Sequence, residues 1–191
     1  MQNNKLNSVV ILVLACTFIS FTAAAGGLKN IDHYLEYSPG FSSSGQPDKN
    51  QIKQLSENNF KKIIYLAFTD QSSSLANEDR IVKSLGMEFI HIPVDFDNPT
   101  LNDFNAFVAV MKSTPSTKTL LHCQINLRAS TFSFLYRVIY RKVPMKAAKD
   151  DLDKIWEPNP VWFKFIKTVL ENHGLSPDCD DCDWGSNEFP A

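Results

Sequence analysis

The chain has 191 residues, of which 43% are hydrophobic and 21% charged, and its formal net charge is -2. This is ordinary globular composition, and the length suits one domain with a hydrophobic core. Lysine and arginine are spread along the chain. This argues against a nucleic-acid partner, which usually needs a clustered basic face.

The first 25 residues have the pattern of a signal peptide. Lys5 gives a basic start, an apolar run occupies 9–21, and Ala23 and Ala25 have the small-x-small spacing that precedes cleavage. The run is shorter than the about 20 residues that a membrane span needs, so a membrane contact is expected only if this segment stays uncleaved. We expect cleavage after Ala25 and an exported protein, either periplasmic or secreted.

Strand-like and helix-like segments alternate along the rest of the chain. They follow an irregular lead-in that we place at 26–40 and that stays rich in Gly and Ser up to Ser44. The β-branched run at 62–66 is typical of a buried strand, and Pro160 suits the first position of a helix. We expect strands at 62–66, 88–94 and 117–122, and helices at 48–58, 76–85, 101–112 and 129–141, from Pro144 onward and from Pro160 to His173.

This alternation predicts a parallel central sheet with helices on both faces, which is a three-layer α/β fold. We place the domain at 41–175. In such folds ligands bind at the carboxyl ends of the strands. The sequence therefore places Asp95, Asp97 and the loop after His122 on one rim. His91, inside an apolar strand, is expected to be a core or rim residue and not a catalytic one.

The segment from His122 to Ser130 carries the chemistry. A strand ends at His122-Cys123, four residues follow, and Arg128 then precedes a helix. Backbone N–H groups at a helix N-terminus favour a thiolate at Cys123 and an oxyanion in the same loop. The planar guanidinium of Arg128 can bind two phosphate oxygens at once. We expect Cys123 to be the nucleophile and His122 to be another of the catalytic residues. The expected phosphate-binding residues are Gln124, Ile125, Asn126, Leu127 and Arg128.

Further residues have candidate roles around this loop. Asn126 is expected to adopt the positive φ that a curled loop needs, because Asn is among the best non-glycine residues there; the alternative is a solvent-facing turn residue. A general acid must protonate the leaving oxygen, and Asp97 is preferred over Asp95 because it lies further from the strand end. Ser130, with Thr131 as substitute, is the hydroxyl expected to steady the thiolate when it leaves.

The strand-His-Cys-loop-Arg-helix unit resembles the signature of protein tyrosine and dual-specificity phosphatases. The chain is more similar to the bacterial phosphatase-like family related to the N-terminal part of beta-lactamase-hydrolase-like proteins. That family shares a Ser-Gly-Gln-Pro motif, here at 44–47, an Ile-Pro-Val strand, here at 92–94, and a His-Cys-x4-Arg loop, here at 122–128.

The resemblance covers roughly 41–175 and implies a cysteine-phosphatase fold. It also implies hydrolysis of a phosphomonoester through a phosphocysteine intermediate, without a metal or other cofactor. Cys123 would attack, Arg128 would hold the phosphoryl oxygens, and an Asp would protonate the leaving group. The partner would be a phosphorylated protein or small molecule.

Two departures keep alternatives open. The loop has four residues between Cys123 and Arg128, one fewer than in standard tyrosine phosphatases, and Ala129 stands where a hydroxyl residue normally follows Arg. Rhodanese-type sulfurtransferases carry a persulfide on a cysteine loop with this shorter spacing, so sulfur transfer is the competing enzyme class. His122 and the Ser-Gly-Gln-Pro motif favour the phosphatase-like family. A catalytically inactive phosphate-binding module is the third interpretation.

Residues 176–191 form an acidic tail that we expect outside the core. After cleavage, Cys123, Cys179 and Cys182 remain, and an odd number leaves one thiol over. In an oxidising compartment a local disulfide between Cys179 and Cys182 is the favoured pairing. A loose metal-binding tail and two free thiols are the alternatives. No metal is expected at the Cys123 site.

Overall fold

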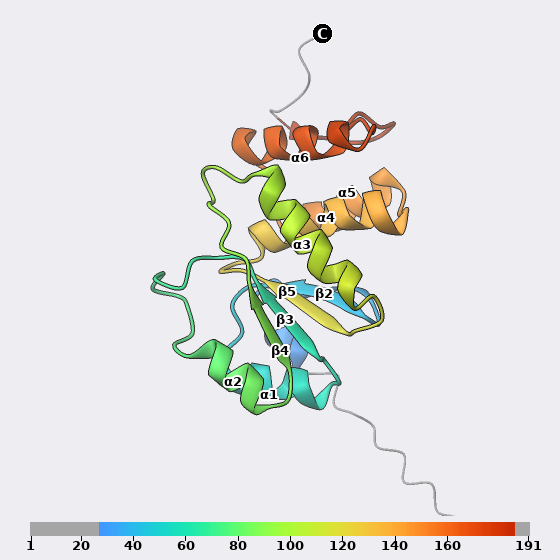
Figure 1. Cartoon of the computed structure of the whole chain (residues 1–191). Coiled ribbons are helices and arrows are strands. Elements are labelled where there is room, and N and C mark those ends of the chain that lie inside the picture. The colour runs from blue at the N-terminus through green and yellow to red at the C-terminus, as the bar shows by residue number, and fades with distance from the viewer. Residues whose placement is uncertain (1–26, 186–191) are drawn as a thin grey trace, which may run out of the picture.

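The computed structural model describes residues 27–185 as three layers, with a five-stranded sheet between two sets of helices (Figure 1). The strands pair in the order β1-β2-β5-β3-β4, with β1 antiparallel to β2 and the other neighbours parallel. Their bounds are β1 (Leu35–Ser38), β2 (Phe41–Ser44), β3 (Lys62–Tyr65), β4 (Glu88–His91) and β5 (Thr119–His122).

Helices cover both faces of this sheet, and each face buries its own apolar cluster. The first two α-helices lie on one face with a short 3-10 helix, and the other four lie on the opposite face (Figure 1). The three-layer α/β fold predicted from the sequence is confirmed. The helices are η1 (Leu28–Asn30), α1 (Lys49–Glu57), α2 (Glu78–Ser84), α3 (Leu101–Ser113), α4 (Leu127–Arg141), α5 (Met145–Asp153) and α6 (Pro160–Asn172).

Local signals explain where these helices begin and end. The Asp48 side chain accepts from the Gln51 amide in a capping box that opens α1. The Asn159 side chain accepts from the Trp162 amide ahead of Pro160, which is the first residue of α6. The helix expected at 129–141 begins earlier, at Leu127, directly after the N-cap residue Asn126, whose backbone is left-handed.

The expectation of an irregular segment up to Ser44 is wrong, because β1 and β2 form a hairpin there. Serine is not among the residues enriched in strands. The serines of β2 are nevertheless fully buried, and their hydroxyls form hydrogen bonds. Ser42 Oγ lies 3.0 Å from Tyr34 Oη, and Ser43 Oγ lies 2.8 Å from Tyr37 Oη. β2 pairs in parallel with β5, so the end of β2 lies beside the end of the strand that carries the predicted loop.

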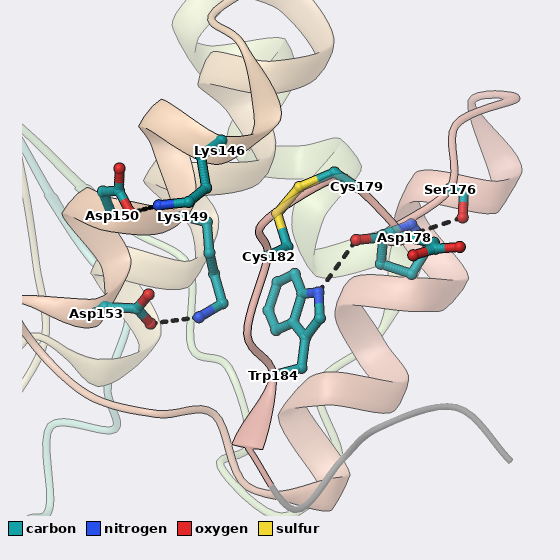
Figure 2. Close-up of a disulfide and its surroundings, with 10 residues drawn as sticks. Lys146, Lys149, Asp150, Asp153, Ser176, Asp178, Cys179, Cys182 and Trp184 are labelled. Carbon is teal, nitrogen blue, oxygen red and sulfur yellow. Dashed lines mark hydrogen bonds and ion pairs between the residues drawn. A yellow bond between two sulfur atoms is a disulfide. The ribbon is translucent and has the colours of Figure 1, made fainter.

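The expectation that the acidic tail lies outside the core is wrong for the part of the tail that ends at Trp184. That side chain is 3% exposed, and its ring lies against Phe134 of α4 and Phe163 of α6. Cys179 and Cys182 are joined in a disulfide just before it (Figure 2). Burying a large indole outweighs the preference of the flanking carboxylates for water.

The predicted signal peptide at 1–25 lies outside the described residues, as does the tail beyond 185. Between residues 27 and 185, no helix is long and apolar enough to cross a membrane. Export and cleavage after Ala25 therefore stay predictions.

Candidate active site

The predicted loop runs from Cys123 to Asn126, between the central strand β5 and the long helix α4. The Cys123 amide donates to Ser44 O at 3.3 Å, and the Gln46 amide donates to Gln124 O at 2.8 Å. The approach is so close that a Cβ on Gly45 would lie 2.9 Å from Gln124 O. The Ser-Gly-Gln-Pro motif thus holds the loop through backbone contacts. Its glycine is required because the backbone of the motif and the backbone of the loop lie too close for a Cβ.

Asn126 has φ 70°, as the sequence predicts for a curled loop. Its side chain is buried, and Nδ2 donates to His33 O at 2.7 Å. This position therefore gives the loop both its left-handed turn and a bond to the segment before β1. The first N–H groups of α4 follow directly, where they have no carbonyl of a preceding turn to bond.

Arg128 is the second residue of α4 and is 6% exposed. Its Nε donates to Val94 O at 3.0 Å, and its guanidinium lies 5.0 Å from the Phe96 ring centre. These contacts hold the plane of the guanidinium from one side. The two Nη groups are its remaining donors.

The predicted nucleophile, clamp and acids line one cavity of about 450 Å³. Cys123 and Arg128 come from the loop and α4, while Asp95 and Asp97 come from the connection between β4 and α3. The loop residues Gln124, Ile125 and Leu127 complete this side of the cavity. The structure thus brings together the groups that the sequence places on one rim.

The two candidate acids have different positions in their loop. Asp95 Oδ1 accepts from the Asp97 amide at 3.0 Å, so the Asp95 side chain shapes a local turn. Both aspartates are exposed, so what distinguishes them is that the Asp95 carboxylate is engaged in this turn. This difference supports Asp97 as the acid that can reach a leaving group.

Ser130 and Thr131 lie on the first turns of α4 and are buried. Both hydroxyls donate to Leu127 O, at 3.1 Å for Ser130 and 3.0 Å for Thr131. The predicted role of Ser130 at the thiolate stays a prediction, because its hydroxyl bonds the helix backbone. Rotation about one side-chain torsion would re-aim the hydroxyl.

A buried carboxylate beside His122 was missed by the sequence reasoning. His122 is fully buried and Glu78 is 5% exposed, and Nε2 of the first lies 3.0 Å from Oε1 of the second. Gln46 Nε2 donates to the other oxygen, Glu78 Oε2, at 3.0 Å. In the sequence, Glu78 is an acidic residue at the start of an expected helix. Such a residue usually only complements the helix dipole, so it did not indicate a role at the site.

Tyr65 of β3 adjoins this pair. Its ring stacks on His122 at 4.6 Å and on His91 at 5.3 Å between ring centres. Burial raises the pKa of the Tyr65 phenol; the hydrogen bond with Ser74 lowers this pKa, and the negative charges of Glu78 and Cys123 raise it. These groups therefore lie within electrostatic reach of one another. His91 is a rim residue, as expected, and its Nε2 lies 2.7 Å from Ala67 O.

The loop after β3 also borders the site, which the sequence did not indicate. Phe68 and Gln71 line the cavity with Cys123. Gln124 Nε2 donates to Ser73 Oγ at 3.1 Å, which ties this loop to the Cys123 loop. In the described part of the chain, no group of three or more His, Cys, Asp or Glu side chains could hold a metal ion.

Solved structures with this fold include known phosphatases. A putative phosphatase (DUF442) from Shewanella putrefaciens CN-32 is 28% identical, with a TM-score of 0.70, over 77% of this chain and 97% of that chain. Tk-PTP in its active form is 16% identical, with a TM-score of 0.62, over 73% and 97% of the two chains. PTPMT1 in complex with PI(5)P is 18% identical, with a TM-score of 0.63, over 75% and 97%.

A search of curated proteins found no match to the chain. The profile of the family described as DSP-PTPase phosphatase fused to NAD+ kinase matches residues 29–155. That range is more than half of the chain and contains the whole Cys123 loop with the strand before it and the helix after it. The chain therefore belongs to this family of DSP-PTPase phosphatases.

Proposed function

We propose that the protein hydrolyses phosphomonoesters without a metal, through a phosphocysteine intermediate on Cys123. The observation that carries the proposal is the common cavity of Cys123, Arg128 and Asp97 at the N-terminus of α4. Amides at a helix start and one guanidinium together favour a dianionic phosphoryl group. Family membership supports the phosphatase class.

In the first step, the Cys123 thiolate attacks phosphorus. The S–P bond forms as the bond from phosphorus to the ester oxygen breaks, and Asp97 gives its proton to that oxygen. Arg128 and the loop amides hold the three other oxygens, on which charge accumulates during transfer. The contact between Arg128 Nε and Val94 O keeps the guanidinium in place while its Nη groups bind.

In the second step, water replaces the cysteine. The Asp97 carboxylate takes a proton from the water, oxygen bonds to phosphorus, and the S–P bond breaks to return a thiolate. The Ser130 hydroxyl would turn from Leu127 O to donate to this thiolate. The Ser130→Ala variant should then accumulate phosphocysteine, which intact-protein mass spectrometry detects.

The site of action proposed is the exported side of the membrane, in the periplasm or outside the cell, after cleavage near Ala25. The sequence pattern of residues 1–25 supports this. An N-terminal sequence of the protein recovered from its natural compartment would begin at Gly26 under this proposal. A mature chain that still begins at Met1 would contradict it.

The discriminating experiment compares two reactions. Wild-type protein in excess chelator should hydrolyse a small aryl phosphate, Cys123→Ser should not, and neither should move sulfur from thiosulfate to cyanide. Sulfur transfer that depends on Cys123, without hydrolysis, would establish the rhodanese-like alternative. If wild type does neither but binds inorganic phosphate, and Arg128→Ala removes that binding, the protein is a catalytically inactive phosphate-binding module.

A further inference from the structure

His122, the last residue of β5, has a buried acidic partner that no motif around Cys123 includes. Glu78, the first residue of α2, brings Oε1 within 3.0 Å of His122 Nε2. Among the described residues neither His122 Nε2 nor Glu78 Oε1 has a hydrogen-bond partner, so this close approach is a contact of charge and not a hydrogen bond. An ionised carboxylate and the lone pair of an unprotonated Nε2 would repel each other at this distance, whereas a proton on Nε2 makes the contact favourable.

The carboxylate of Glu78 is held from its other side by the Ser-Gly-Gln-Pro motif. The Gln46 side-chain amide donates to Glu78 Oε2 at 3.0 Å, while the Gln46 backbone amide donates to Gln124 O at 2.8 Å. One residue thus fixes both the carboxylate and the loop that carries Cys123. This arrangement fixes the position of Glu78 relative to His122.

A carboxylate that is 5% exposed is costly unless a positive charge neutralises it. The charged and titratable groups around His122 are Glu78 from α2, Tyr65 from β3, His91 beyond Tyr65, and Cys123 and Arg128 from the loop and α4. Arg128 is turned to Val94 O and to the cavity. His122 is therefore the group placed to supply the neutralising charge, as an imidazolium.

We propose that Glu78 is a positioning residue that keeps the His122 imidazole oriented and protonated beside Cys123. His122 precedes Cys123 directly, and a cation near a thiol stabilises the thiolate. Glu78 would thereby set the reactivity of the nucleophile without touching the substrate. The inference rests on Cys123 being the reactive thiol of the proposed function.

The test follows alkylation of Cys123 by iodoacetamide across pH, read from the mass of the peptide that contains Cys123. Glu78→Gln keeps the size of the side chain and removes its charge. We expect the midpoint of the alkylation profile to rise by about one pH unit, which is about tenfold slower alkylation below the midpoint. Asp79→Asn on the same helix is the matched control, because the Asp79 side chain is 46% exposed and pairs with Lys83; the midpoint of this variant should stay at the wild-type value.

His122→Gln should raise the midpoint as Glu78→Gln does, and the double variant should raise it no further, because the two residues act as one unit. A folded Glu78→Gln protein with the wild-type midpoint would overturn the inference. So would additive shifts in the double variant. These readouts are independent of turnover, so a protein that hydrolyses no phosphoester but shows the shift refutes the proposed function alone.

A second measurement needs no Glu78 variant and covers the case in which that variant fails to fold. In wild-type protein labelled with nitrogen-15 histidine, the His122 signals are assigned by their loss in His122→Gln. Both ring nitrogens of His122 should be protonated at neutral pH. A neutral His122 ring would refute the inference directly.

Discussion

Asn126 gives the sharpest test of the loop geometry, because its side chain has two separable effects. Its backbone has φ 70°, and its Nδ2 donates to His33 O at 2.7 Å. Asn126→Gly keeps the backbone conformation at no steric cost and loses a hydrogen bond worth about 0.5–1.5 kcal/mol. Asn126→Ala loses the same bond and adds about 1–2 kcal/mol, because alanine lacks the short polar side chain that lets asparagine adopt the left-handed region.

We therefore expect the free energy of unfolding to fall by about 1 kcal/mol in Asn126→Gly and by about 2–3 kcal/mol in Asn126→Ala. Urea titration followed by tryptophan fluorescence measures both values. The rate of aryl phosphate hydrolysis should fall more in the alanine variant, because the strained residue lies between Cys123 and Arg128, the proposed nucleophile and phosphate-binding arginine.

Asn59 supplies the matched control, since it is exposed and has φ 65° in a turn after α1. The alanine and glycine variants at position 59 should differ by about the same 1–2 kcal/mol, while Asn59→Gly itself should be close to neutral. Equal stability of Asn126→Ala and Asn126→Gly would refute the reasoning, because the left-handed backbone would then not be what residue 126 provides.

Three further predictions concern the acids, the tail and a buried phenol. Asp97→Asn should lower kcat on phenyl phosphate by about 10²–10⁴-fold, and Asp95→Asn by much less; the reverse order in steady-state assays would move the acid to Asp95. Trp184→Ala should lower the free energy of unfolding by about 3–5 kcal/mol, and Trp184→Phe by less; a loss below about 1 kcal/mol in urea titration would mean that the tail does not belong to the core. Burial raises the pKa of Tyr37 from 10.0 to about 12, so the unfolded chain binds fewer protons than the folded one between these values. Stability should fall by about 2 kcal/mol as the pH rises through that window, and a Tyr37→Phe protein with the same decline in chemical denaturation would exclude this phenol as its source.

The sequence was sufficient for the centre of the molecule because its signals there are local. An apolar strand, the His122-Cys123 pair, an Asn suited to positive φ and an amphipathic helix follow one another without a gap. Each feature constrains its neighbour, so the loop and its position on the rim could be predicted together.

The parts that the sequence reasoning missed depend on contacts between distant segments. The serines of β2 look like loop residues until the tyrosine hydroxyls that bond them are in place. Glu78 is an unremarkable acid at a helix start until β5 places His122 against it. Trp184 stands among carboxylates, and only the docked tail reveals that its indole is buried between two helices. The periodicity of apolar residues describes a local stretch of sequence, so it cannot predict contacts between distant segments.

The loop around Cys123 is held by three segments that are far from it in sequence. His33 contributes a carbonyl, Gly45 and Gln46 contribute close backbone contacts, and Val94 contributes the carbonyl that holds Arg128. None of these contacts exists in a chain that is still being made or is held unfolded. In such a chain Cys123 is an ordinary thiol with no oxyanion site around it. Under the proposed function, the reactivity of Cys123 is therefore acquired only on folding, in whichever compartment the chain folds.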